Sequence, residues 1–424
     1  MSADKVVLAG YLVRCPLGGY AWQVLHYLVG LRSLGLDPYF YEDTAYYSDC
    51  FDPVSGNMHV APDAGVAFAA DFFERCGFAD RWVFWDSQRD RYHGLHRETC
   101  ETLLHEARLL ITLAAVNHVP RVPRQSRVFI DIDPGFTQIR VSEGDQALRE
   151  LLDDHDLHFT IGENIGTAAC SIPVERYHWR PTRQPVAIEL WGGPESRGAG
   201  ERGSRGAGVN LSSPPTPLHP SSPAPLHPSS PAPLPPGPPA WTTIGRWDER
   251  QRDVTVGGER YAWNKRAEWL KFLDLPARTG EPFLVAMDVH KTPADADLLM
   301  RHGWQIADPI AVSRDAFVYR DFIQRSKGEF TVAKDLNVRL STGWFSDRSA
   351  CYLAAGRPVI TQSTGFERHL PVGLGLFAIK DVLQAAAAVA AVTADYESHA
   401  RAGRNVAIER FDAPRVITKL LAAL

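Results

Sequence analysis

Short apolar runs alternate with amphipathic stretches along most of the chain. The run KVVLAGYLV at residues 5–13 has the content of a buried strand, and residues 20–35 carry apolar side chains at helical spacing. A second apolar run, LDPYFYED at residues 36–43, ends in two acids. Because strand, crossover helix and strand form the unit of a parallel sheet, the pattern predicts an α/β fold from the N-terminus onward.

The same alternation continues on both sides of an unusual central segment. Before this segment, strands are predicted at 107–116, 126–136 and 156–166; after it, they are predicted at 240–247, 282–289, 303–309 and 328–334. These strands are short and continuously apolar, as expected for a sheet that is covered on both faces. The segment 261–275 is predicted to be helical, and residues 381–424 contain strong helix formers. The chain is therefore expected to form two α/β halves with a helical C-terminus.

The central segment, residues 191–240, has a different composition. It repeats SRGAG and then PLHPSSPA, so that glycine, serine and proline dominate and few side chains can be buried. This composition favours a disordered or polyproline-like insertion. A proline-rich ligand for a protein partner is the alternative, and the low-complexity insertion is the preferred interpretation. The predicted divisions are an N-terminal domain at 1–190, the insertion, a C-terminal domain at 241–395 and helices at 396–424.

Composition narrows the classes of function. Of the 424 residues, 45% are hydrophobic and 22% are charged, and the net charge of −5 gives no general reason to bind nucleic acid or an anionic membrane. No segment has the length of an integral membrane helix, and the first apolar run is too short for a signal peptide. The six cysteines are scattered, so reduced thiols and a cytoplasmic location are expected.

The stretch GWFSDRSACYLAAGRPVI at residues 343–360 has a high density of polar residues at the start of a short predicted helix. Ser346 is a favourable N-cap, and the acid Asp347 suits a helix N-terminus. The free N–H groups of Asp347, Arg348 and Ser349, together with the Arg348 guanidinium, would make a phosphate site. The alternative is that Ser346 and Asp347 only cap the helix.

Together with its neighbours, the block STGWFSDRSACYLAAGRPVITQSTGFE resembles the donor-binding half of GT-B glycosyltransferases, which use nucleotide sugars. More closely, the chain is similar to an uncharacterised bacterial glycosyltransferase-like group with this run, which also carries FIDIDPGFTQ, GENIG and WRPTRQPV. The resemblance covers nearly all of the chain outside 191–240. It implies two Rossmann-like domains that face a cleft, with the acceptor on the N-terminal side and the donor on the C-terminal side.

The resemblance also implies which residues bind the donor. Those that would face the diphosphate and nucleoside are Gly343, Trp344, Ser346, Asp347, Arg348 and Ser349, and those near the sugar would be Gln362, Thr364, Gly365 and Phe366.

The match to the superfamily has departures. Plant-type members have a histidine where this chain has Ser341 and a ribose-binding glutamate near Ser349 or Cys351, and the paired glutamates of retaining members are absent. Asp347 and Arg348 are the expected substitutes. The nucleotide (UDP, GDP, TDP or ADP) and the stereochemical outcome stay open.

Further donor-side candidates lie before this block. In retaining GT-B enzymes a Gly-Arg pair after the first strand of the second domain, with a lysine beyond, neutralises the diphosphate, and Gly245, Arg246 and Lys265 match that pattern. An exposed arginine and an ordinary helix lysine are the alternative. Glu329 and Lys334 would also face the donor by the resemblance, although in isolation they suit a solvated charged loop.

The acceptor side has its own candidates. Asp131 and Asp133 form a DxD pair, which binds Mn²⁺ or Mg²⁺ in GT-A transferases, but here they are interpreted as strand-end residues of the cleft. Either acid, or Glu163, is a candidate general base, and a structural role for the aspartates is the alternative. Gly18 and Gly19 precede the first helix and are expected on the acceptor side.

The preferred hypothesis is metal-independent transfer of a sugar from a nucleotide sugar to a small-molecule or glycan acceptor, with no bound cofactor. Three alternatives remain open. One is another GT-B activity, such as a nucleotide-sugar epimerase or a phosphorylase. A second is a metal-dependent transferase that uses Asp131 and Asp133, and the third is a catalytically degenerate scaffold with a protein partner for its proline-rich insertion.

Overall fold

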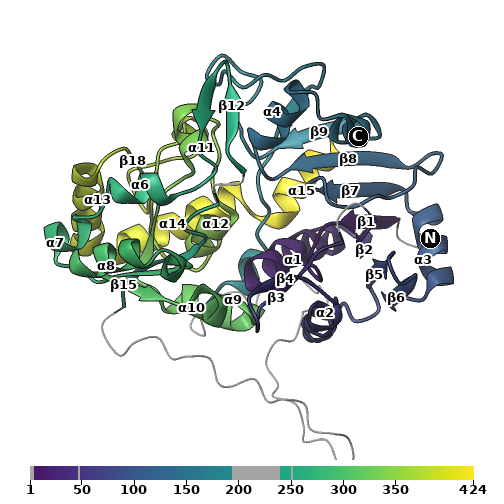
Figure 1. Ribbon diagram of the computed structural model, residues 1–424, viewed down its shortest axis with the longest axis horizontal. Coiled ribbons are helices and arrows are strands. Elements are labelled where there is room, and N and C mark those ends of the chain that lie inside the picture. The colour runs from purple at the N-terminus through teal and green to yellow at the C-terminus, as the bar shows by residue number, and fades with distance from the viewer. Residues whose placement is uncertain (1–3, 46–47, 193–238, 250–251) are drawn as a thin grey trace, which may run out of the picture.

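The computed structural model describes residues 4–45, 48–192, 239–249 and 252–424, which form two α/β halves (Figure 1). Each half is built on its own parallel sheet, and the two sheets do not share a strand. The N-terminal half runs from purple to teal in Figure 1, and the C-terminal half from teal-green to yellow. The two α/β halves expected from the apolar pattern are confirmed.

The N-terminal sheet has eight strands in the order β10-β9-β8-β7-β1-β2-β5-β6, all parallel to their neighbours except β6. The strands are β1 (Lys5–Ala9), β2 (Asp37–Asp43), β5 (Trp82–Asp86), β6 (Arg91–Gly94), β7 (Leu109–Leu113), β8 (Ser126–Asp131), β9 (Leu157–Thr160) and β10 (Trp179–Pro181). The helices are α1 (Gly18–Ser33), α2 (Asp63–Arg75), α3 (Arg97–Glu106), α4 (Phe136–Ser142) and α5 (Gln146–Asp153), and β3 (Cys50–Asp52) pairs with β4 (Asn57–Val60) in a separate hairpin.

The C-terminal sheet has six parallel strands in the order β15-β14-β11-β16-β17-β18. They are β11 (Trp241–Gly245), β14 (Phe283–Met287), β15 (Trp304–Ala307), β16 (Gly328–Thr331), β17 (Val359–Gln362) and β18 (Leu376–Ile379), and β12 (Val254–Val256) pairs with β13 (Glu259–Tyr261) in a hairpin. The helices are α6 (Arg266–Leu270), α7 (Leu275–Thr279), α8 (Pro293–Arg301), α9 (Pro309–Ser313), α10 (Ala316–Arg325), α11 (Asp335–Arg339), α12 (Asp347–Ala354), α13 (Val382–Ala394), α14 (Tyr396–Arg410) and α15 (Ala413–Leu421).

One predicted helix is wrong in extent. Residues 261–275 contain the end of β13, an irregular turn and the short helix α6 rather than one continuous helix. Two carboxylates bind the backbone at this point: the Ala262 N–H donates to Asp335 (3.0 Å) and the Trp263 N–H donates to Asp253 (2.8 Å). Because acids can compete in this way for backbone N–H groups, the helix starts later than its apolar pattern suggests.

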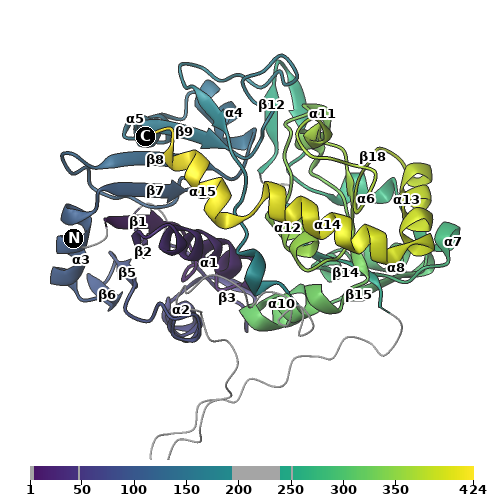
Figure 2. The same cartoon turned by 180° about the vertical axis from the view of Figure 1, so that it is seen from behind.

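Helices from the two halves pack into one shared apolar core. Helix α15 leaves the C-terminal half and packs against α1, and α10 of the C-terminal half also contacts α1 (Figures 1 and 2). At this contact the Trp22 Nε1–H donates to the Ala316 carbonyl (2.6 Å), and a Cβ on Gly18 would lie 2.5 Å from the Cβ of Tyr319. Gly18 is therefore needed for the close approach of the halves.

The start of the predicted insertion belongs to this core. Trp191 is fully buried and its Nε1–H donates to His26 Nε2 (2.8 Å), while its carbonyl accepts from Gln324 (3.2 Å). The proline-rich repeats lie outside the described residues. Within the described ranges, no helix combines the length and apolar content that crossing a bilayer requires.

Candidate functional site

Two adjoining cavities lie between the halves, near the carboxyl ends of β1, β8 and β16. The smaller, about 150 Å³, is lined by both halves, including Gln23 from α1 and Lys334 after β16. The larger, about 460 Å³, is lined mainly by the N-terminal half. Tyr11 and Asp133 line both cavities and so mark their junction. Ligand sites of open parallel sheets lie at this end of the strands.

The N-terminus of α12 opens on the smaller cavity. Trp344 and Asp347 form part of its wall. The first N–H groups of an α-helix have no carbonyl acceptor within the helix, and here the Arg348 N–H donates to the Asp347 carboxylate. Ser346 occupies the N-cap position, as predicted, but its hydroxyl bonds to the neighbouring Asp347 carboxylate (3.3 Å) rather than to the helix backbone. Burial raises the pKa of Asp347. The arrangement leaves the positive end of the helix dipole facing the cavity.

The Arg348 side chain is directed into the C-terminal half. Its Nε lies 2.6 Å from Glu329 Oε1, and its two terminal nitrogens donate to the Ile244 carbonyl (2.5 Å) and to the Thr331 hydroxyl (3.2 Å). Glu329 is fully buried. The guanidinium therefore joins α12 to β11 and β16 and keeps its positive charge behind the helix N-terminus.

Lys265 is a buried cation without a partner of opposite charge. The residue is 8% exposed, and its Nζ makes no hydrogen bond or ion pair with any described residue. The centroid of the Trp344 ring lies 5.8 Å from Nζ. Burial, reinforced by the positive charge of Arg348 and opposed by Glu329 and Glu249, holds the pKa of Lys265 well below its usual value. Lys265 itself is not part of either cavity wall, but the neighbouring Trp344 lines the smaller cavity, so an anion bound there would lie close to an ammonium that is costly to bury alone.

Two further cations share one acid near the cavity. Glu249 lies 3.4 Å from Arg246 and 3.6 Å from Lys334, and the Lys334 Nζ also lies 3.8 Å from the ring centroid of Trp263. Burial lowers the pKa of Lys334. Gly245 ends β11 immediately before Arg246, and a Cβ there would lie 3.8 Å from the Arg348 guanidinium. The donor-side cations predicted from the sequence thus gather around the carboxyl end of β11.

The loop before α12 and the loop after β17 are hydrogen-bonded to each other. The Gly343 N–H donates to the Thr364 carbonyl (2.8 Å), and the Thr364 hydroxyl donates to the Trp344 carbonyl (2.6 Å). The side chain of Gln362 is buried, accepts from the Ala333 N–H (3.2 Å) and bonds to Glu268. The loops are therefore adjacent, but Gln362 is engaged inside the C-terminal half.

Glycines in these loops allow close contact with the N-terminal half. A Cβ on Gly343 would lie 2.8 Å from the Asn164 backbone nitrogen, and one on Gly365 would lie 2.6 Å from Asn164 Nδ2. Both glycines have positive φ, at 76° and 87°. The Asn164 Nδ2–H also donates to the Ser341 carbonyl (2.8 Å), so Asn164 joins the two halves. Ser349 is fully buried, and its hydroxyl has no partner among the described residues.

Glu163 lies apart from the aspartates. It forms a two-bond ion pair with Arg183 (2.8 and 2.9 Å) and lines a different cavity, of about 240 Å³, beside α15. Gly19, by contrast, packs near the Tyr319 ring, and a Cβ on Gly19 would lie 3.7 Å from the Tyr319 hydroxyl oxygen. Neither residue is brought to the junction of the two cleft cavities.

The two aspartates of the DxD pair have different environments. Asp131 is 1% exposed and accepts from Thr137 (2.7 Å), Gln138 (2.8 Å) and Thr160 (2.9 Å). Burial raises its pKa to about 6. The Asp133 carboxylate is about one third exposed, lies at the cavity junction and pairs with Arg252 of the C-terminal half (2.9 Å). Both acids line the larger cavity, but Asp131 is engaged by three side-chain donors, whereas Asp133 is more exposed and lines both cavities.

We expect Asp131→Asn to destabilise the protein by about 1–3 kcal/mol, because it turns one acceptor of a buried cluster into a donor that faces other donors. Urea denaturation measures this change. The control is Glu143→Gln, at an exposed position of the same half. Asp145→Asn would not serve as a control, because Asp145 caps α5. Equal stability of Asp131→Asn and Glu143→Gln would contradict the structural role.

Sequence reasoning missed several residues of the cleft. The rings of Tyr11 and Tyr20 pack in a tilted arrangement with centroids 4.6 Å apart at the smaller cavity. Trp263 and Arg252 reach the cleft from the β12–β13 region. Tyr11 follows the carboxyl end of β1, where a ligand site was expected, so its position was a usable signal. Arg252 and Trp263 come from an irregular connection that has no sequence signature.

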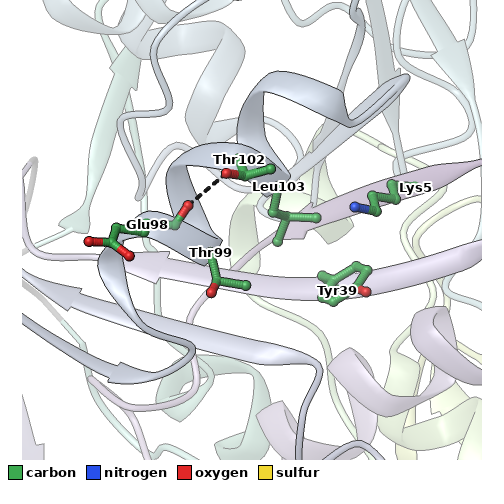
Figure 3. A pocket seen from close by; sticks show the side chains of 6 residues that line it. All are labelled: Lys5, Tyr39, Glu98, Thr99, Thr102 and Leu103. Carbon is green, nitrogen blue, oxygen red and sulfur yellow. Dashed lines mark hydrogen bonds between the residues drawn. The ribbon is translucent and has the colours of Figure 1, made fainter.

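Another pocket lies between α3 and the N-terminal sheet (Figure 3). It has a volume of about 280 Å³, and Figure 3 shows Thr99 and Leu103 of α3 beside Lys5 and Tyr39 of the sheet. Lys5 is already paired with Glu106 (2.5 Å). This pocket is separate from the cleft, and we assign it no role. Over the described part of the chain, no group of three or more His, Cys, Asp or Glu residues is arranged to hold a metal ion.

Comparisons with known proteins identify the fold. No protein-family model and no curated protein matches the chain. Among solved structures, Anabaena HepE in complex with UDP-glucose aligns over 99% of this chain and 100% of its own, with a TM-score of 0.51 and 10% identity. An alpha-glucosyltransferase in complex with UDP and a 13-mer DNA aligns over 99% of both chains, with a TM-score of 0.53 and 8% identity. The chain therefore has the fold of the GT-B glycosyltransferases.

Proposed function

We propose that this protein transfers a glycosyl group from a nucleoside diphosphate sugar to a hydroxyl-bearing acceptor. The donor lies against the C-terminal half with its diphosphate at the smaller cavity, and the acceptor occupies the larger cavity against the N-terminal half. The observation that carries the proposal is Lys265, a largely buried cation without a hydrogen bond or ion pair to a described residue, whose Nζ lies 5.8 Å from the ring of Trp344 in the cavity wall.

A bound diphosphate would satisfy both features at once. It would supply the negative charge that Lys265 lacks, and its oxygens would accept from the first N–H groups of α12. Arg246 and Lys334 add positive charge from the end of β11 and from the segment after β16. The two solved neighbours hold UDP or UDP-glucose, which agrees with this choice of ligand class.

The remaining donor-side residues determine the shape of this site and its electrostatic potential. We assign Arg348 and Glu329 the task of fixing α12, with the Arg348 charge acting from behind the helix. Trp344 is assigned to the nucleoside. The other residues taken to build the donor loops are Gly245, Gly343, Ser346, Asp347, Ser349, Gln362, Thr364 and Gly365.

The chemical step would use groups from both halves. The acceptor oxygen attacks the anomeric carbon, the bond from that carbon to the diphosphate oxygen breaks, and the electron pair leaves with the nucleoside diphosphate. Lys265 and the amides of α12 stabilise the leaving charge. Asp133 takes the proton of the acceptor hydroxyl as general base. Protein cations thereby meet the charge of the leaving group, so we expect turnover to continue in EDTA.

A panel of UDP-, GDP-, TDP- and ADP-sugars tests the proposal. The full chain is incubated with each donor, and the release of nucleoside diphosphate is followed with and without EDTA. We expect release from one donor or from a small subset. If no donor is bound or consumed, the proposal fails, and a scaffold role would take its place.

For Asp133→Asn we expect turnover to fall by about 10²–10⁴-fold while UDP binding is unchanged, because the variant keeps the shape of the acid but cannot accept the proton. Initial rates and UDP titrations measure the two properties separately. Glu143→Gln, an exposed acid in the same half, is the matched control. Unchanged turnover in Asp133→Asn would remove Asp133 from the mechanism.

A further inference from the structure

We infer that the acceptor is a small amphipathic molecule with an apolar body and its reacting hydroxyl at one end. The inference rests on the proposed function and names the acceptor class for the larger cavity. That cavity, about 460 Å³, falls within the size of small-molecule sites.

The wall of the larger cavity combines apolar side chains with polar ones, which are Arg14, Asp49, Asp131, Thr137, Arg140 and Arg252 besides the two residues of the junction. Tyr11 and Asp133 lie where it joins the smaller cavity, so hydrogen-bonding groups mark the end that faces the donor. The residues that line only the larger cavity include the apolar set Met58, Ala114, Ala115, Val116 and Leu148. An acceptor that fits this wall has its hydroxyl at the junction and its apolar body away from it.

Several polar side chains of the wall are already engaged within the protein. The Arg14 guanidinium bonds to Glu42 (3.0 Å) and to the Val116 carbonyl (3.0 Å). The Thr137 hydroxyl donates to Asp131 (2.7 Å), and Arg140 is paired with Asp145. An oligosaccharide buried here would leave many of its hydroxyls without partners, which is unfavourable.

Near the junction, Arg252 and Trp263 of the C-terminal half meet Phe136 of α4. The Arg252 guanidinium lies 4.4 Å from the ring centroid of Phe136, and that ring lies 5.0 Å from the ring of Trp263. Arg252 also pairs with Asp133. The reacting end of the acceptor therefore meets the ion pair of Asp133 and Arg252 beside two aromatic rings.

Binding of 4-methylumbelliferone, a small flat phenol, tests the inference without a donor. Its fluorescence is titrated with the full chain, and maltotriose is titrated by calorimetry for comparison. We expect the phenol to bind and maltotriose to show no binding. Ala115 lies partly buried against the apolar cluster of this region, so Ala115→Glu places a charge in the cavity and Ala115→Leu adds bulk alone.

We expect Ala115→Glu to weaken binding of the phenol at least tenfold and Ala115→Leu to change it less than threefold, with thermal midpoints and UDP affinity preserved in both. The inference would be overturned if maltotriose bound and the phenol did not. It would also be overturned if the wild type and Ala115→Glu bound the phenol equally well. The UDP titrations are read separately: loss of UDP binding in the wild type would refute the proposed function, whereas the acceptor result would refute only the acceptor class.

Discussion

Lys265→Met is expected to make the ligand-free protein more stable and to weaken UDP binding at least about 30-fold, a loss of ~2 kcal/mol. Methionine has a similar length and removes a buried charge without a partner, so the unfolding free energy rises by about 1–3 kcal/mol. The same removal deprives the diphosphate of its buried cation. Urea denaturation and UDP calorimetry measure the two effects.

The stability gain of Lys265→Met depends on pH. Burial lowers the pKa of Lys265 in the folded protein, so between the folded and unfolded pKa values the unfolded chain binds more protons. Wild-type stability therefore rises with pH through this window, and the advantage of the variant is largest below the folded pKa of Lys265 and narrows toward pH 10.5. Lys380→Met, at an exposed position of the same half, is the control. A destabilised Lys265→Met with unchanged UDP affinity would assign Lys265 a purely structural role.

Arg348→Met is expected to have the largest effect on stability, a loss of about 3–5 kcal/mol, because it leaves Glu329 buried without its partner. Glu329 Oε2 already has no partner among the described residues, so Oε1 and its bond to Arg348 dominate the environment of the carboxylate. The double variant Arg348→Met/Glu329→Met removes both charges and is expected to recover most of the loss. Urea denaturation of the wild type, Arg348→Met and the double variant measures the loss of stability and its recovery.

The exposed pair of Arg401 and Glu397 (3.9 Å) provides the control for this cycle. Arg401→Met should change the unfolding free energy by less than about 1 kcal/mol, because surface ion pairs contribute little. If Arg348→Met keeps wild-type stability but loses UDP binding, the guanidinium faces the ligand instead of Glu329, and the interior ion pair is not its main role.

The fold was predictable because it depends on apolar periodicity. The runs around β1 and β14 consist mainly of apolar residues, and the segment 343–360 contains the predicted short helix α12 and the start of β17. The helix predicted at 261–275 was wrong in extent, since carboxylates distant in sequence bind its first N–H groups. Such long-range competition has no local signal.

The composition of the cleft was only partly predictable. Residue type and spacing indicated which cations lie near the end of β11, but not which of them are paired. Arg348 has an interior partner at Glu329, whereas Lys265 has none among the described residues, and this difference depends on side-chain direction in the folded chain. The environments of Asp131 and Asp133 differ for the same reason: three side chains donate to Asp131, whereas Asp133 is more exposed and lines both cavities.

A crystal structure of the full chain soaked with UDP tests the central claim most directly. The account predicts the diphosphate in the smaller cavity, with its oxygens within hydrogen-bonding distance of Lys265 Nζ and of the first N–H groups of α12, and the nucleoside beside Trp344. Density for UDP outside the cleft, or a diphosphate that leaves Lys265 without a partner, would contradict it.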